Sequence, residues 1–538
     1  MGAARPSAWF NGIVLPHFLP PQKHSARPAA DASGIRRPAD IASSNTPLAS
    51  LLLHYPPHLQ FLAQITPKPI LVFLRLHLRC AYDGSQESNE KGSIRRGFSM
   101  ATSRYALVNG YVLDGSADMK PREGLVVVVS DGKFEAVAPE RELDLSGCVR
   151  IDLAGGYIMP GLVNMHVHLA SAGKAPKPNA KPVDYKGLMD KLGKYRLVKH
   201  LFYKMAKKYA TTELKSGVTT LRAVGGLFDI DGRVRDAVEA GKVAGPRIIA
   251  ANTGVSVPGG HFAGSLATEA TTPEEAAADV RRAVESGADI IKLMITGGVM
   301  DATAEGEPGA LRMPPELVKA ACDEAHGLGK IVAAHVESTE GVRVALENGV
   351  DTIEHGAVPT PEILQLFHER GAALICTLSP AIPYALFPLE VSHCGELGRK
   401  NGRIVFDGVR ECARACLADG IPVGLGTDTG CPFITHYNMW REVRYFAHFC
   451  DVSNAFALHT ATLGNARIAG IADQVGSIEP GKQADFIVTE RNPLDDLANL
   501  RHLAMVARNG NIMRKPQIKP LPGVDEALDA CDAEILRG

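Results

Sequence analysis

The sequence predicts an α/β protein with a (β/α)8 TIM-like barrel and a small β-sandwich formed from both flanks of that barrel. Two observations predict this fold. The middle of the chain alternates short β-branched or apolar runs with helical stretches, which is typical of parallel strands covered by helices. On both sides of this middle part, β-runs are separated by Asp-Gly and Asn-Gly turns, which is typical of antiparallel sheets.

Eight strand-like runs make up the middle part. They are LVNMHVHL, VTTLRAV, PRIIAAN, DIIKLMI, KIVAAHV, DTIEHG, ALICTL and PVGLGTD. Helical stretches such as PEEAAADVRRAVESG lie between them and end at Gly or Asn, as helices commonly do. Eight strands and their helices over about 300 residues fit a barrel, for which ~250 residues is typical. We place this barrel at residues 161–470.

The two flanks of the barrel read as β-strands. ALVNGYVLDG, GLVVVVSDGKFEAVA and CVRIDLAGGYIM precede it, and SIEPGKQADFIVTE and AMVARNGNIM follow it. These runs predict one composite sandwich from residues 103–160 and 475–515. Residues 516–538 are expected to form a C-terminal tail.

The first 99 residues differ in composition, because they hold 11 of the 35 prolines. An apolar patch at 61–80 is interrupted by Pro67, Pro69 and Arg75, so it lacks the ~20 apolar residues of a membrane span. Residues 1–99 are then a transit peptide, a disordered extension, or a segment outside a native protein that starts at Met100. We favour the third interpretation, because the strand pattern begins near Met100.

The nearly equal numbers of basic and acidic side chains limit the kinds of molecule that the protein can bind through its net charge. The chain has 58 basic and 59 acidic side chains, which argues against nucleic acid or an anionic membrane held by bulk charge.

The ten cysteines include no CxxC motif, so neither a redox motif nor a disulfide framework is indicated. We expect a cytoplasmic homo-oligomer with a small-molecule substrate.

Six polar residues lie in or at the ends of five of these strand-like runs. They are His166, His168, Lys292, His335, His355 and Asp428. Taken singly, each has a plainer interpretation: a core histidine, a snorkelling lysine, or an aspartate of a turn or helix cap. Active-site groups of barrels sit at the C-terminal ends of strands, so the ordered set favours a site for two divalent metals and metal-assisted hydrolysis.

These segments resemble the amidohydrolase superfamily, on its branch of imidazolonepropionase-like hydrolases, Xaa-Pro-type metallo-dipeptidases and ochratoxinase-like amidases. The resemblance runs from about Tyr105 to about Met513. It rests on PGL-x-x-x-H-x-H from Pro160, IK-x-x-x-TGG from Ile291, HVES, IEHG, GTD and GSIEPGKQADFIVTERNPLDDL. It implies that His166 and His168 bind the more buried ion, and that Asp428 ligates this ion and transfers the proton.

The resemblance also implies roles for the other three residues. Lys292 would be N-carboxylated and bridge both ions, and His335 and His355 would bind the second ion. Carboxylation matters because an ammonium group has no acceptor atom and cannot bind a metal. Zinc is the expected metal.

The resemblance implies a hydrolase that cleaves the C–N bond of a small amide, such as a dipeptide or N-acyl amino acid, through a metal-bridging hydroxide. His261, in PGGHFAG after the third strand, is a candidate substrate-binding residue or a surface-loop histidine. For Arg222 and Tyr384 we favour packing over a place in the pocket. The alternatives are a mononuclear cyclic-amide hydrolase or deaminase, which would leave Lys292 unmodified, and a non-catalytic relative.

We expect residues 1–99 to be dispensable for folding and hydrolysis. A chain that begins at Met100 should remain soluble and match the kcat and KM of the 538-residue chain, because the family-like pattern starts just after this methionine. Solubility, thermal unfolding and kinetics of the two chains test this. Aggregation or lost activity of the shorter chain would show that the boundary is wrong.

Overall fold

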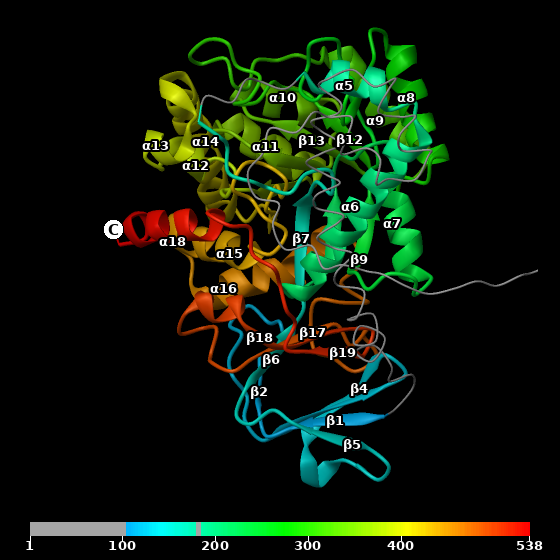
Figure 1. The fold of residues 1–538 in the computed structure, drawn as a ribbon, viewed down its shortest axis with the longest axis vertical. Coiled ribbons are helices and arrows are strands. Elements are labelled where there is room, and N and C mark those ends of the chain that lie inside the picture. Colours follow the sequence, from blue (N-terminus) through cyan, green and yellow to red (C-terminus); the bar gives the residue numbers. More distant parts are fainter. Residues whose placement is uncertain (1–103, 179–183, 538) are drawn as a thin grey trace, which may run out of the picture. The chain divides into compact units, whose positions relative to one another are not determined.

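The computed structural model describes residues 104–178 and 184–537, all of which belong to one compact unit. The interpretations of residues 1–99 therefore lie outside the described residues. Figure 1 shows a strand-rich part built from β1–β6 and β17–β19, followed along the long axis by a larger part that mixes strands and helices.

Strands from the two flanks of the chain share one sheet. This five-stranded sheet has the order β19-β18-β17-β6-β2, and β6 pairs antiparallel with β17, with Met159 opposite Ile487. A four-stranded sheet has the order β4-β3-β1-β5. Leu107, Val127 and Phe134 of the smaller sheet pack with Ile158 and Phe486 of the larger one, so the two sheets bury a common apolar core. The bounds of these strands are β1 (Tyr105–Val108), β2 (Tyr111–Val112), β3 (Leu125–Ser130), β4 (Lys133–Pro139), β5 (Val149–Asp152), β6 (Tyr157–Pro160), β17 (Phe486–Thr489), β18 (Leu503–Arg508) and β19 (Asn511–Arg514).

The middle of the chain forms two parallel sheets. One has the order β7-β8-β9, and the other is seven-stranded with the order β11-β10-β12-β13-β14-β15-β16. Most of these strands are buried along their whole length, as expected for parallel strands covered on both faces. Their bounds are β7 (Leu162–Val167), β8 (Val218–Ala223), β9 (Arg247–Ala250), β10 (Gly254–Ser256), β11 (Ala267–Glu269), β12 (Ile291–Met294), β13 (Val332–Val336), β14 (Thr352–His355), β15 (Ala373–Cys376) and β16 (Val423–Leu425).

Backbone hydrogen bonds join the two parallel sheets at both edges of the three-stranded one. On one side, the N–H of Asp428 donates to His166 O (2.8 Å) and the N–H of His168 donates to Thr429 O (3.0 Å). On the other side, the N–H of Asp289 donates to Ala250 O (2.7 Å). The segment after β16 therefore lies beside β7, and the segment before β12 lies beside β9.

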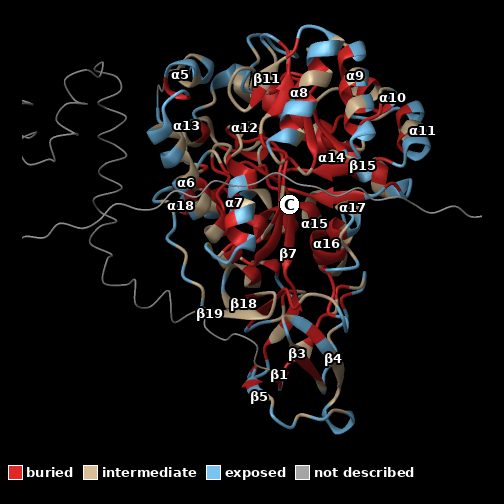
Figure 2. Cartoon of the chain, turned by 90° about the vertical axis from the view of Figure 1, so that its right-hand side faces the viewer, coloured by how far each residue is buried: buried red, intermediate tan, exposed pale blue. Residues whose placement is uncertain are grey.

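The helices lie around the parallel strands, and Figure 2 shows buried strands inside and exposed helix faces outside. Several helices start at a side-chain cap: Thr272, Ser338 and Thr360 each accept a backbone N–H three residues on, as helix N-caps do. No helix within 104–178 or 184–537 is both long and apolar enough to cross a membrane. The helix bounds are α5 (Tyr185–Leu192), α6 (Arg196–Lys215), α7 (Ile230–Glu239), α8 (Pro273–Glu285), α9 (Pro315–Gly327), α10 (Thr339–Glu347), α11 (Pro361–Arg370), α12 (Ile382–Ala385), α13 (Leu389–Ser392), α14 (Gly395–Ala418), α15 (Met439–Phe449), α16 (Asn454–His459), α17 (Asn465–Ile468) and α18 (Val524–Ile535), with shorter turns at η3 (Glu140–Glu142), η4 (Thr460–Gly464) and η5 (Leu497–Arg501).

The C-terminal segment 516–538, which the sequence predicts as a tail, contains helix α18. Val524, Leu528 and Cys531 of this helix are buried in the main core. Arg441 of α15 forms ion pairs with two α18 carboxylates, Asp529 and Asp532. The signal for this helix is present in the sequence, because its buried residues recur at helical spacing.

Candidate metal centre

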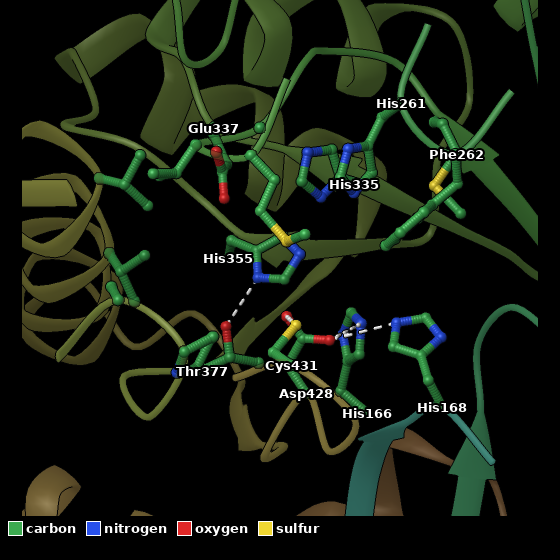
Figure 3. Close-up of a pocket in the computed structure, with 18 of the residues that line it drawn as sticks. His166, His168, His261, Phe262, His335, Glu337, His355, Thr377, Asp428 and Cys431 are labelled. Atoms are coloured by element: carbon green, nitrogen blue, oxygen red, sulfur yellow. Dashed lines mark hydrogen bonds and ion pairs between the residues drawn. The ribbon is translucent and has the colours of Figure 1, made fainter. Parts of the chain in front are cut away.

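All six candidate ligands line one pocket. They reach it from β7, β12, β13 and β14 and from the turn after β16. Figure 3 labels the four histidines and Asp428 there. The pocket encloses about 650 Å³, including the part open to solvent. The structure therefore brings together the complete set of side chains that the sequence predicts as metal ligands.

His166 and His168 converge on Asp428. Their Nε2 atoms lie 3.5 Å and 3.2 Å from Asp428 Oδ1. Their Nδ1 atoms face other partners: His166 Nδ1 lies 2.8 Å from Glu354 Oε2, and His168 Nδ1 donates to Gly225 O at 2.7 Å. A hydrogen bond on the far nitrogen fixes the ring and leaves Nε2 to bind a metal.

His335 and His355 form the second half of the cluster. Their ring centroids are 4.7 Å apart, and His355 is 4.9 Å from His166. A hydrogen bond of 2.7 Å joins His355 Nδ1 to Thr377 Oγ1, and His335 Nε2 donates to Gly297 O at 3.3 Å. Each ring is thus held by a group outside the cluster.

Three histidines of the cluster, His166, His335 and His355, favour the neutral form that binds metals. Burial lowers the pKa of His166 to about 4, and it lowers the pKa of His335 and His355 well below their ordinary value. Two groups of residues each bring their donor atoms within 4.8 Å of one another: His166, His355 and Asp428 form one group, and His335, Glu337 and His355 form the other.

Backbone conformation also marks the site. His355 and Asp428 have φ values of 71° and 54°, in the left-handed region that non-glycine residues seldom adopt. Such strain is concentrated at functional sites, where the surrounding structure imposes it. Both strained residues, His355 and Asp428, are neighbours of His166 in the cluster.

Lys292 has an unusual environment for a lysine. It is 1% exposed, and its Nζ atom has no hydrogen-bond partner among the described residues. Burial lowers the pKa of Lys292 to about 8, although Glu354 opposes the shift. The neutral amine is the form that can react with carbon dioxide, and Lys292 lines the pocket together with the four histidines. The site therefore fits a carboxylated lysine beside the histidines.

A buried ion pair lies beneath His166. Arg222 Nη2 donates to both carboxylate oxygens of Glu354, at 2.6 Å and 2.8 Å. Burial raises the pKa of Glu354, but Arg222 and His166 outweigh burial and hold this pKa below its ordinary value. Glu354 therefore stays charged and orients His166. Arg222 does not line the pocket but packs behind it, as expected from the sequence. Tyr384 lines the pocket, so the expectation that it only packs in the core is wrong.

His261 lies in the pocket and not on the surface of its loop. Its ring stacks on His335 at 4.2 Å with an interplanar angle of 14°, and its Nδ1 contacts Asp301 Oδ2. Burial raises the pKa of Asp301, but His261 outweighs it and the net shift is downward. A charged Asp301 keeps His261 in place.

Glu337 is a pocket residue that the sequence reasoning missed. It lines the pocket, and burial, together with Asp428 and Asp301, raises its pKa to about 8. The sequence contains a signal for Glu337, because this residue follows the candidate ligand His335 by two positions and alternate residues of a strand share a face.

The sequence of the chain is similar to a known protein family and to proteins that have been named. The pattern of the amidohydrolase family matches residues 157–513. Ochratoxinase from Aspergillus niger is 24% identical over 339 residues, which is 57% of this chain and 68% of that protein.

Two solved structures are also similar. The putative prolidase from Bifidobacterium longum has a TM-score of 0.70 and 35% identity, covering 80% of this chain and 99% of that one. A Xaa-Pro dipeptidase with methionine bound in its active site has a TM-score of 0.66 and 28% identity, covering 77% of this chain and 100% of that one.

Proposed function

Because the chain belongs to the amidohydrolase family, as its sequence motifs predict, we propose that it is a metal-dependent hydrolase of small amides, such as dipeptides or N-acyl amino acids. The observation that carries this proposal is the convergence of four histidines, Lys292 and Asp428 on one pocket. The similarity to a prolidase and a Xaa-Pro dipeptidase supports an amide substrate.

The proposal includes the predicted architecture. We assign the barrel to residues 161–470 and the composite sandwich to residues 103–160 and 475–515. The hydrogen bonds at both edges of the three-stranded sheet support a closed barrel of eight strands, in which β9 and β10 together form the third. The pairing of β6 with β17 supports the sandwich.

The donor set fits two divalent ions, for which we propose zinc. His166, His168 and Asp428 would hold one ion, His335 and His355 the other, and carboxylated Lys292 would bridge them. Such ions make a water nucleophilic near neutral pH and polarise a substrate carbonyl. Imidazole and carboxylate ligands are those that zinc prefers.

Asp428 and His261 have complementary roles in this proposal. Asp428 accepts the proton of the attacking water and passes it to the leaving amine, because an amine leaves readily only when protonated. His261, held in place by Asp301, binds the negative end of the substrate. Glu354 and Arg222 keep His166 in its orientation.

Two alternatives are less well supported. A mononuclear cyclic-amide hydrolase or deaminase leaves Lys292 without a ligand role, although its Nζ is buried without a partner among the described residues. A non-catalytic relative does not need six converging ligand side chains. The cytoplasmic location and the homo-oligomer stay predictions.

The metal content tests the proposal directly. The purified protein should contain about two divalent ions per chain, and His166→Ala should lose both metal and activity. His368→Ala, which removes an exposed histidine bonded to Asp419, should lose neither. Well under one ion per chain, with no gain on reconstitution, would contradict the metal assignment.

A substrate panel should follow with the metal-loaded protein. We expect hydrolysis of dipeptides, Xaa-Pro dipeptides among them, or of N-acyl amino acids. Turnover of cyclic amides alone would favour the mononuclear alternative, and no turnover of any amide would contradict the proposed function.

A further inference from the structure

Helices α5 and α6, with the turn between them, carry a local excess of positive charge. Residues 185–215 contain eight lysines and one arginine but only two acidic residues, Asp190 and Glu213. Glu213 is buried and contacts His436, so it does not offset the charge at the surface. Because the whole chain has a net charge of −1, this excess reflects where the charges lie and not the overall composition.

The exposed residues of α6 form one face of the helix. Residues three or four positions apart lie on the same side of a helix, and Ala206 and Ala210 are buried on the opposite side. No carboxylate within the described residues pairs with Arg196, Lys204 or Lys208. The exposed residues of α6 and of the turn before it, which we call the basic face, are Lys194, Tyr195, Arg196, Leu197, His200, Leu201, Lys204 and Lys208.

Large apolar side chains lie between the charges of the basic face. Tyr195 and Leu197 are each 53% exposed, and Leu201 is 39% exposed. Neither leucine belongs to the hydrophobic core. Burial of these side chains against a partner would remove apolar surface from water, which is favourable. The basic face therefore combines positive charge with apolar surface that a partner can cover.

Charge argues against two occupants that the chain itself could supply. A second copy that met this face with its own α5 and α6 would bring like charges together, which is repulsive. Residues 1–82 contain eight basic residues and only Asp31 and Asp40 as acidic ones, so this segment does not complement the basic face either. Charge complementarity calls for a negatively charged partner.

We propose that the basic face binds the surface of a membrane that contains anionic phospholipids. Lysine and arginine side chains are attracted to such headgroups, and tyrosine is enriched at the level of the headgroups. Leucines of a helix that lies on a membrane enter the boundary between headgroups and acyl chains, which gives Leu197 and Leu201 an apolar environment. A nucleic acid offers the negative charge but no comparable layer for leucine.

The arrangement of the charges also favours lipid over an acidic protein. The basic side chains are spread along α6 from Arg196 to Lys208, and Arg196, Lys204 and Lys208 are not held by ion pairs within the described residues. Long, unpaired side chains along one helix suit the mobile charge of a lipid surface better than the fixed carboxylates of a folded protein. The helix lies on the membrane and does not span it.

Binding to vesicles tests the proposal. At low ionic strength, the full chain should bind phosphatidylcholine vesicles that contain about one third phosphatidylserine about tenfold or more tightly than vesicles of phosphatidylcholine alone. Added salt should weaken this binding, because it screens exposed charges. Equal binding to the two kinds of vesicle, or no binding to either, would overturn the proposal.

A double charge reversal locates the binding on α6. Lys204→Glu combined with Lys208→Glu should weaken binding to the anionic vesicles by about 30-fold or more, since each lysine near such a surface contributes several-fold. Lys120→Glu combined with Lys519→Glu changes the net charge by the same amount at two exposed lysines outside α5 and α6, and should bind as the wild type does. Similar losses in both variants would show that net charge attracts the vesicles, and would contradict a role for the basic face.

A leucine variant distinguishes lipid from an acidic macromolecule. Leu197→Ala combined with Leu201→Ala should weaken vesicle binding by about tenfold, because less apolar surface enters the membrane. Its thermal unfolding should stay close to that of the wild type, since both side chains are exposed in the free protein. Unchanged vesicle binding in this variant, or binding of polyglutamate or RNA without any binding of vesicles, would assign the basic face to an acidic protein or a nucleic acid and overturn the proposal.

Discussion

Asp428→Asn should lower kcat by about 10²–10⁴-fold, the range of a general acid–base group, while much of the metal stays bound. An amide side chain cannot accept the proton of the attacking water, although its oxygen can still face His166 and His168. The four histidines and Lys292 remain as ligands. The loss should fall on kcat more than on KM, because proton transfer matters mainly in the transition state.

Asparagine is the suitable replacement at this position. Asp428 has a φ of 54°, and asparagine is among the residues that tolerate the left-handed region, so the turn after β16 should keep its shape. Asp323→Asn, on the exposed face of α9, serves as the control. A kcat near the wild-type value, with bound metal verified, would move the proton-transfer role elsewhere, and His261 is the next candidate.

Lys292→Ala should lose metal, and its activity should fall by more than the 10–100-fold typical of residues that only support a ligand. The substitution removes both oxygens of the proposed carbamate and leaves a cavity where the buried side chain lay. Added acetate or propionate should enter this cavity, restore a carboxylate between the two sets of histidines and recover part of the activity. Metal content and kcat, with and without the added acid, are the measurements.

Lys292→Met is the matched control for this rescue. Methionine fills most of the volume of the lysine but cannot be carboxylated, so its activity should be lost and the added acid should not restore it. Thermal unfolding of both variants separates loss of ligand from loss of fold. Full activity and normal metal content in Lys292→Met would instead favour the mononuclear alternative.

The candidate ligands could be predicted because their signal is local. Each one lies in or at the end of a short β-run, as His355 does in DTIEHG and Asp428 in PVGLGTD. Parallel strands that alternate with helices bring their C-terminal ends to one side of the fold. Six separate positions in the sequence therefore indicated one pocket, and the structure places all six side chains there.

The supporting contacts could not be predicted in this way. Glu354 adjoins the candidate ligand His355, yet it contacts His166 and Arg222, which lie 188 and 132 positions away. Asp301 meets His261 across 40 positions. No periodicity in the sequence links such pairs, because their contact depends on how neighbouring strands and loops are placed.

By itself, the sequence determined the order of strands, the two flanking β-regions and the set of candidate ligands, since these follow from hydrophobic periodicity and turn residues. The tertiary structure alone decided which polar groups are paired and which are not. It places Arg222 beside Glu354, packs α18 on the main core through Leu528, and leaves Lys292 Nζ and Glu337 Oε2 buried without partners among the described residues. The physical reason is that pairing and desolvation depend on distances across the fold, which a local pattern of residues does not contain.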